Sequence, residues 1–459
     1  MKPSLSADSL PSPPTAMTPR GAHWVMVVRL SALAERLRSS LFFVPMAFVV
    51  FGLLLGLAGL EVDTRITEGG TELPDEMTST VDSARAVLTT VAGATITFAG
   101  IAFSVSLLLI QQASSQYSPR VIHGFFRDPF NKRVMGVVVG TFTFCLVVLR
   151  SVRSALEQDG SPVIPNLSVA LAVALGVVSI LSIIAFISHS AHAMDVSKIL
   201  QDVSDDATVR VERLWNEPAD GSADETEPTR PDIDDDDVLD VDVATSGWIQ
   251  QIDFERIASA AGSGHARLHV AVGRYAVPGT PLCTISPSPE DADEARDIVR
   301  GALVVGDART AQQDVTYGVR QLADVALKAL SPGVNDPTTA QDAIFHLGGV
   351  VRELLRRDPP PAMRKVGDCH IEVSEDATHA DVVALAFDEI RLAANGLPTV
   401  CIYLLEVLDL LDEALRDRPS EVTQGLRDQA SLVRDGAAIA TLLDHDRRRI
   451  EDAYDARFG

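Results

Sequence analysis

Apolar residues are distributed unevenly and divide the chain into two halves. Before residue 190 they gather in four nearly uncharged runs, at residues 41–60, 86–110, 134–150 and 167–187. The first run, LFFVPMAFVVFGLLLGLAGL, has 20 residues. A helix of that size is about 30 Å long, which matches the core of a bilayer. The third run is shorter, but Arg133 and Arg150 at its ends can reach the headgroups. The pattern predicts four transmembrane helices within residues 41–190.

The basic residues between the runs predict an orientation. Lys and Arg precede the first run and lie between the second and third runs, whereas the segment from Glu61 to Arg85 has seven acidic and two basic residues. Because cytoplasmic loops are enriched in Lys and Arg, we expect both termini in the cytoplasm. Residues 1–20 are rich in Ser and Pro and lack an apolar stretch. We therefore expect residues 1–40 to be a cytoplasmic segment, disordered at first, with no cleavable signal peptide.

Polar and acidic residues follow the fourth run. Residues 201–242 contain 16 acidic side chains against three arginines, and we interpret this stretch as an acidic linker. A calcium site at residues 232–237 is the alternative, but the Gly and terminal Glu of an EF-hand loop are missing. Short alternating segments at residues 243–290 predict a small β-containing unit, loosely similar to the hairpins of barrel-sandwich domains. Helical periodicity over residues 291–459 predicts a helical domain.

Composition narrows the possible partners. The 63 acidic and 39 basic residues give a formal charge of −24, so a nucleic acid would be repelled. The four cysteines show no CxxC spacing and indicate neither disulfides nor zinc. The predicted fold class is an α-helical integral membrane protein with four transmembrane helices and a cytoplasmic α+β domain, in which a small β unit precedes a helical bundle.

Small or polar residues recur at steps of three, four or seven along the second run and just after it. Its pathway-lining candidates are Thr90, Thr97, Ser104, Gln111 and Ser114. One interpretation is close packing against a neighbouring helix, which small residues permit. The other is a water-lined pathway. Because no acidic or basic residue lies inside the runs, apart from Arg150 at the end of the third, a passive route is favoured over a driven one.

Histidines near the fourth run are weak candidates for a metal site. His189 and His192 are three residues apart, and His123 in the basic loop could approach them. Imidazole ligates transition metals and titrates near neutral pH. The alternative is that these side chains only satisfy hydrogen bonds at the membrane interface.

The string SPGVNDPTT lies between two predicted helices and is a candidate ligand site. Asn335, Asp336, Thr338 and Thr339, with Arg309 if the helices fold back, could hold an anionic ligand at a helix start. The alternative is a capped turn, with Asp336 as the cap and proline in the first helical turn. The segment DARTAQQD, which contains Arg309, is likewise either a recognition face or an ion-paired surface.

No GxSxG, HExxH, P-loop or dinucleotide motif occurs in the sequence. We therefore assign no catalytic residue and no cofactor, and an enzyme is the least supported class. A membrane-bound enzyme would need a polar pocket near the three histidines.

Several strings resemble a bacterial family of predicted membrane proteins known as domain of unknown function 2254. They are FSVSLLLIQQASSQYSPRV after the second run, GWIQQID and YAVPGTPL in the β unit, and DARTAQQDVTYGVRQLADVALKALSPGVNDPTTAQD in the helical part. The resemblance implies an inner-membrane location and this two-part architecture. It implies no activity, so no site residue is carried over.

Two functional hypotheses remain. The first is a homo-oligomeric, channel-like or passive transport protein of the lipid bilayer, gated or assembled by its cytoplasmic domain. The second is a membrane-anchored sensor or scaffold whose cytoplasmic domain binds a ligand or partner protein. The sequence leaves the small ligand or ion unknown.

Overall fold

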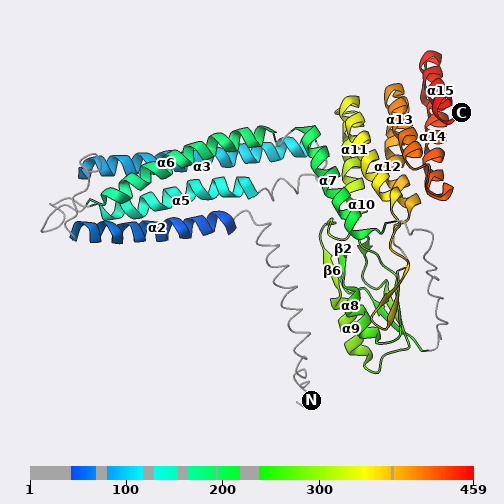
Figure 1. The fold of residues 1–459 in the computed structure, drawn as a ribbon, viewed down its shortest axis with the longest axis horizontal. Helices are drawn as coiled ribbons and strands as arrows, with labels where there is room; N and C mark the ends of the chain where they lie inside the picture. The colour runs from blue at the N-terminus through cyan, green and yellow to red at the C-terminus, as the bar shows by residue number, and fades with distance from the viewer. Residues whose placement is uncertain are drawn as a thin grey trace, which may run out of the picture. The chain divides into compact units, whose positions relative to one another are not determined.

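The computed structural model describes residues 43–68, 80–116, 129–152, 164–192, 195–217, 237–373 and 377–459 (Figure 1). The chain forms two compact units. The first contains residues 1–109 and 123–190, and the second contains residues 110–122 and 191–459.

Four helices lie side by side in the first unit (Figure 1). They are α2 (Phe43–Glu68), α3 (Val81–Gln116), α5 (Pro129–Ser151) and α6 (Asn166–His192). All four are long and apolar enough to cross a membrane by length and composition. Each contains one of the predicted apolar runs, apart from the first two residues of the first run, which lie outside the described residues. The prediction of four apolar helices is confirmed at that level.

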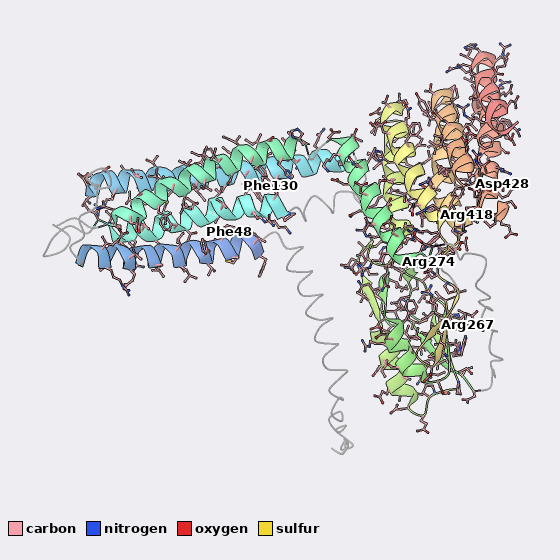
Figure 2. The ribbon with its side chains drawn as sticks, viewed as in Figure 1. Phe48, Phe130, Arg267, Arg274, Arg418 and Asp428 are labelled. Atoms are coloured by element: carbon pink, nitrogen blue, oxygen red, sulfur yellow. The ribbon has the colours of Figure 1, made fainter. Side chains whose placement is uncertain are left out.

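Glycines bring α2 and α5 into close contact. A Cβ atom placed on Gly52 would lie 2.3 Å from the carbonyl oxygen of Gly140, and one on Gly56 would lie 2.8 Å from a methyl group of Val147. On α5, a Cβ atom at Gly136 would lie 2.5 Å from the ring of Phe48, which Figure 2 labels. Both helices thus carry a Gly-x-x-x-Gly spacing on the contact face. Such small residues let helix backbones approach closely in a membrane.

Buried polar groups join α6 to its neighbours. Asp63, buried near the end of α2, accepts hydrogen bonds from the backbone nitrogens of Leu167 and Ser168 at 2.9 and 3.0 Å and from the Ser168 hydroxyl at 2.6 Å. A carboxylate from one helix therefore caps the first turn of another. Farther along α6, the Ser179 hydroxyl is 3.1 Å from the Thr141 hydroxyl of α5.

The second unit is built on a core of helices. They are α7 (Val196–Leu214), α10 (Thr316–Leu330), α11 (Pro337–Arg356), α12 (His379–Ala394), α13 (Pro398–Ala414), α14 (Ser420–Ala440) and α15 (Asp444–Phe458). Buried aliphatic side chains from all of them form one continuous cluster. The helical domain expected over residues 291–459 thus also includes α7, which lies far upstream in the sequence.

The first part of the expected acidic linker is helical in the structure. Residues 201–217 continue α7 and its C-terminal cap, with Leu200, Ala207 and Val211 buried against α10 and α11. The acidic residues of α7 lie on its exposed face, so a high acidic content did not prevent helix packing. Residues 218–236, the remainder of the expected linker apart from Asp237 to Asp242, lie outside the described residues.

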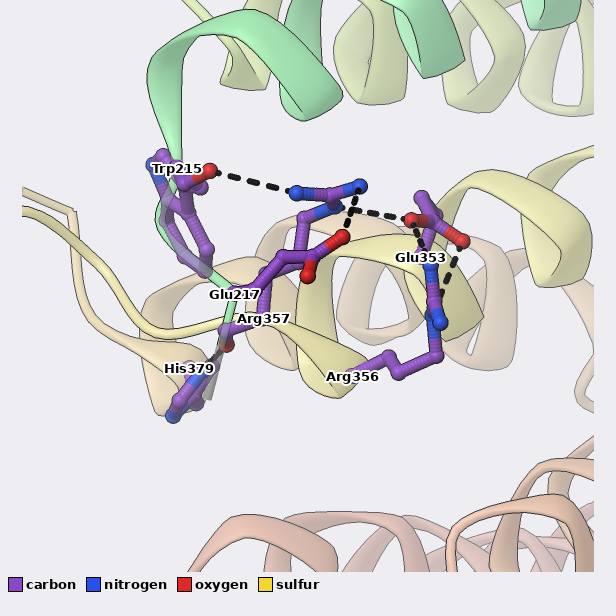
Figure 3. Close-up of polar contacts among 6 residues, drawn as sticks. All are labelled: Trp215, Glu217, Glu353, Arg356, Arg357 and His379. Carbon is purple, nitrogen blue, oxygen red and sulfur yellow. Dashed lines mark hydrogen bonds and ion pairs between the residues drawn. The ribbon is translucent and has the colours of Figure 1, made fainter. Parts of the chain in front are cut away.

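Polar contacts join the end of α7 to the end of α11 (Figure 3). We call the residues that make them the α7 clamp: Trp215, Glu217, Glu353, Arg356 and Arg357. The carboxylate of Glu353 binds Arg356 and Arg357, each at 2.8 Å. Arg357 also donates to the Trp215 carbonyl oxygen at 3.5 Å and lies 3.8 Å from the exposed Glu217 carboxylate. Both Glu353 and Arg357 are buried.

The β part of the second unit has two sheets. The five-stranded sheet has the order β1 (Leu239–Asp242), β5 (Pro281–Ser286), β3 (His265–Leu268), β8 (Cys369–Val373) and β7 (Met363–Val366). The three-stranded sheet has the order β4 (Tyr275–Ala276), β2 (Gly247–Ile252) and β6 (Leu303–Gly306). Helices α8 (Phe254–Ala261) and α9 (Ala292–Gly301) share a buried hydrophobic cluster with the strands.

The sheets extend beyond the small β unit expected at residues 243–290. Strand β1 begins at Leu239, β6 follows α9, and β8 pairs in parallel with β3 from about 100 residues downstream, as His265 lies opposite His370. A parallel pair needs a long crossover connection, so local alternation cannot reveal it.

Candidate functional site

The candidate pathway residues lie on the outer face of α3. Thr90, Thr97 and Ser104, with Gly93 and Gly100 between them, are all exposed in the first unit. We call these five residues the α3 stripe. A Cβ atom added at either glycine would meet no atom within 4 Å. The stripe therefore packs against none of the helices of its own unit that the structure describes.

The hydroxyl groups of the stripe are bound to their own helix. Thr90 donates to the Ala86 carbonyl oxygen at 2.7 Å, Thr97 to Gly93 at 2.8 Å and Ser104 to Gly100 at 2.9 Å. These bonds satisfy each hydroxyl hydrogen, while oxygen lone pairs stay on the outer face. The stripe is thus polar enough to contact water or another helix, yet it carries no charge.

The other two pathway candidates follow the stripe farther along α3. Gln111 is exposed, but it lies in the part of α3 that belongs to the second unit. The side chain of Ser114 lies outside the described residues. Within the first unit, close glycine packing occurs between α2 and α5, which sequence reasoning had not singled out. The spacing of Gly52 and Gly56, and of Gly136 and Gly140, is the signal that could have revealed it.

The histidine candidates do not form a described cluster. The ring of His189 lies 4.6 Å from that of Phe130, centroid to centroid, at the start of α5. His192 belongs to the second unit, and His123 lies outside the described residues. Across the described ranges, no group of three or more His, Cys, Asp or Glu side chains could hold a metal ion.

Neighbouring side chains in the second unit surround the guanidinium of Arg309. Its guanidinium binds Asp314 through two nitrogens, at 2.9 and 2.6 Å, and donates to the Thr316 hydroxyl at 2.9 Å. Asp314 is 4% exposed and also accepts from the backbone nitrogen and the hydroxyl of Thr316. The guanidinium also lies over the rings of Trp248 and Tyr317, at 5.9 and 5.5 Å. Arg309 thus positions the start of α10.

The rest of the DARTAQQD segment is attached to strand β2. Gln250 donates to the Ala308 carbonyl oxygen at 2.7 Å, and the side chains of Gln251 and Gln312 are hydrogen-bonded to each other. The Gln313 side-chain oxygen accepts from the backbone nitrogen of Ile252 at 2.9 Å. The polar residues of this motif therefore join the β part to the helical core.

The SPGVNDPTT turn has the geometry of a capped helix start. Asp336 accepts from the Thr339 backbone nitrogen at 3.1 Å and from its hydroxyl at 2.6 Å, and Pro337 opens α11. These hydrogen bonds lower the pKa of Asp336 below its usual value. Asn335 adopts a left-handed conformation with φ of 49°, and Thr338 is exposed.

The structure does not bring Arg309 to this turn. Arg309 precedes α10, whereas Asn335 follows it, and a helix of 15 residues separates them by about 20 Å. A joint ligand site of Arg309 with Asn335, Asp336, Thr338 and Thr339 is therefore not assembled in this structure.

Comparison with known proteins identifies three mycobacterial relatives and one family. An alignment of 352 residues shows 33% identity with the uncharacterised protein Mb1321c of Mycobacterium bovis, and with Rv1290c and MT1328 of Mycobacterium tuberculosis. It covers 74% of this chain and 65% of each relative, slightly less than two thirds. No solved structure matches significantly. The family model described as "Predicted membrane protein (DUF2254)" matches residues 38–409, and the chain belongs to that family.

Proposed function

We propose that the protein is a homo-oligomer whose copies turn the α3 stripe toward a shared axis and form a passive, channel-like pathway. The observation that carries this proposal is the exposure of Thr90, Thr97 and Ser104 on the outer face of the unit. Toward lipid, the remaining lone pairs of these three hydroxyl oxygens would lack polar partners. Around a shared axis they would contact water or the neighbouring copies.

The absence of charge supports a passive route. From Ala86 to Gln116 the sequence of α3 contains no acidic or basic residue, whereas proton relays and driven pumps use intramembrane charges. Hydroxyl oxygens can replace part of the hydration shell of a small polar solute. The second unit, joined directly after α6, would gate or assemble the pathway.

Flux through proteoliposomes tests the pathway, with potassium and glycerol as probes. We expect flux of at least one probe above that of empty vesicles, and we expect Ser104→Leu to reduce it about tenfold because leucine narrows and dries the face. Phe103→Leu is the matched control, since Phe103 is exposed beside the stripe, and it should leave the flux unchanged. Equal flux in protein-containing and empty vesicles would remove the pathway.

Cysteine cross-linking tests the shared axis separately. The native residues Cys145, Cys283, Cys369 and Cys401 are buried and free, so an introduced thiol is the accessible one. Burial raises the pKa of Cys283 to about 12 and that of Cys401 to about 11, which keeps both thiols protonated. Under oxidation, Thr97→Cys and Ser104→Cys should give covalent dimers, whereas Ile96→Cys and Phe103→Cys should not. Uniform cross-linking along α3 would contradict the proposed interface.

We further infer a bacterial inner-membrane location with both termini in the cytoplasm. Lys132 and Arg133 at the start of α5, together with the basic residues before α2, support this orientation. A fluorescent protein fused after Gly459 should fluoresce, and alkaline phosphatase inserted within residues 69–79 should be active outside the cytoplasm. An active phosphatase fused after Gly459 would reverse the orientation.

A further inference from the structure

The connection between α14 and α15 carries the most exposed large apolar side chains that the structure describes (Figure 1). Ile439, near the end of α14, is 89% exposed, and Leu442 and Leu443, just before α15, are 93% and 66% exposed. Leu432 is 43% exposed and lies seven residues before Ile439, on the same face of α14. We call these four residues the α14–α15 patch. They belong to the second unit and lie outside the four helices that could cross a membrane.

Polar groups of the same turn also lack partners. The hydroxyl of Thr441, a residue that is 5% exposed, and the Nε of Arg447 are buried and have no hydrogen-bond partner among the described residues. The start of α15 has no side-chain cap either. Buried polar groups are normally hydrogen-bonded, and apolar side chains are seldom exposed as a group. The turn is therefore incompletely satisfied in a single copy, in its apolar part and in its polar part.

The charges around the patch are balanced. Residues 434–451 contain four acidic and four basic residues, whereas the whole chain has a formal charge of −24. Two copies with that charge repel each other, and the repulsion is smallest where a neutral, apolar area meets its counterpart. An anionic lipid surface attracts segments with a surplus of Lys and Arg, which residues 434–451 lack. The balance of charge thus favours a second copy of the chain over a lipid surface.

Two charged side chains beside the patch can pair between copies. Arg448 is exposed and donates to the Asp444 carbonyl oxygen at 3.3 Å, but it pairs with no carboxylate of the described residues. The Asp444 side chain is 82% exposed and lies 3.4 Å from Arg447. About a twofold axis, each contact between two different positions occurs twice, once in each direction. An apolar centre bordered by an arginine and an aspartate is therefore complementary to a second copy of itself.

We propose that the α14–α15 patch joins two copies of the chain about a twofold axis. The aliphatic side chains of one copy pack against those of the other, and Arg448 of each copy lies beside Asp444 of the other. Four aliphatic side chains cover less than the roughly 800 Å² that each partner of a stable interface buries, so we expect a weak, concentration-dependent contact. The proposal does not use the α3 stripe and does not rest on the proposed pathway.

Cysteine cross-linking of the full-length protein in detergent tests the contact. The native cysteines are buried, so Leu442→Cys and Leu443→Cys introduce accessible thiols. Under mild oxidation at least one of them should give covalent dimers, whereas Val209→Cys on α7, at a position that is 63% exposed, should not. Similar dimer yields from all three variants, or no dimer from either leucine variant, would overturn the proposal. Thr97→Cys and Ser104→Cys report on the α3 stripe in the same assay, so the two proposals can fail separately.

An exchange of charges tests the pairing of Arg448 with Asp444. In the cross-linking variant, Arg448→Glu places like charges opposite each other and should raise the protein concentration for half-maximal dimer yield about tenfold. Adding Asp444→Arg restores opposite charges and should return that concentration to near its starting value. Arg352→Glu, at an exposed arginine on α11, should leave it unchanged. A loss that Asp444→Arg does not restore would contradict the pairing.

Thiol labelling distinguishes a second copy from a lipid surface. We expect a water-soluble maleimide to label Leu443→Cys more slowly as the protein concentration rises in detergent, because the dimer covers the thiol. In nanodiscs of anionic phosphatidylglycerol that hold a single copy, labelling should be as fast as in dilute detergent solution. Slower labelling in these nanodiscs would assign the patch to the bilayer and overturn the proposal.

Discussion

Replacing Gly52 by alanine is expected to destabilise the first unit by about 2 kcal/mol or more. The added methyl group would lie 2.3 Å from the Gly140 carbonyl oxygen, and a backbone atom cannot move away as a flexible side chain can. The two helices would have to separate along their length, which forfeits the close contacts that hold them together in lipid. The effect is measured by thermal unfolding in detergent, with the loss of the monodisperse species as the signal.

Gly93→Ala is the matched control, because it makes the same chemical change in another membrane helix. No atom lies within 4 Å of the added Cβ at that position. Alanine also has the higher helix propensity, so the control should be neutral or slightly stabilising. A Gly52→Ala variant as stable as Gly93→Ala would mean that α2 and α5 are not in the contact described.

Replacing Glu353 by glutamine is expected to destabilise the second unit by about 3 kcal/mol or more. The substitution removes the carboxylate that binds Arg356 and Arg357 while keeping the side-chain volume. Arg357 is 6% exposed, so its charge cannot be rehydrated without opening the α7 clamp. Denaturant unfolding of the full-length protein in detergent, monitored by circular dichroism, measures the loss.

Glu217→Gln provides the control on the same arginine. Glu217 lies 3.8 Å from Arg357, but its side chain is 79% exposed, so solvent screens the pair and the change should be small. Equal losses in the two variants would show that burial of Glu353 does not decide the effect.

The Glu353 contribution also depends on pH. Burial acts to raise the pKa of Glu353, but the hydrogen bonds and charges of Arg356 and Arg357 outweigh it and lower the pKa below 4.5. Because the folded pKa is lower than the unfolded one, the stabilisation is complete above about pH 4.5 and is lost as the pH falls through the folded pKa. The difference in free energy of unfolding between wild type and Glu353→Gln should therefore become smaller in acid.

The apolar helices could be predicted from sequence because their signal is local. A run such as residues 41–60 satisfies the length and charge requirements of a bilayer without reference to any other segment. The family resemblance, which rested on strings such as DARTAQQD, is likewise confirmed by the family match. The helical periodicity after residue 291 also corresponds to observed helices, except where strands β6, β7 and β8 occur.

The packing partners could not be predicted, because they depend on contacts between distant residues. The high acidic content of α7 led to its interpretation as part of a linker. Its buried residues Leu200, Ala207 and Val211 are nevertheless spaced as on one helix face, among exposed acidic residues. Strand β8 was hidden for the same reason, since its partner β3 lies far upstream. In both cases the burial of a face was decided by tertiary contacts.

The candidate site shows the same division. The small and polar spacing of Thr90, Thr97 and Ser104 could be recognised from sequence, but which way that face points could not. The candidate ligand residues were separated by α10, whose length alone would have sufficed to place Arg309 and Asn335 at opposite ends.

The residues on both sides of the acidic stretch 218–236, which lies outside the described residues, belong to the second unit. Glu217 lies beside Arg357 in the helical core, and Asp237 accepts a hydrogen bond from the Ser288 backbone nitrogen in the β part. Doubling the length of a flexible connection costs only about 0.6 kcal/mol of closure entropy. Insertions there leave the connection from α6 to α7 unchanged, and a protease cut would yield two fragments that still share one hydrophobic core. The stretch is therefore a natural place to insert a tag or an entire reporter domain.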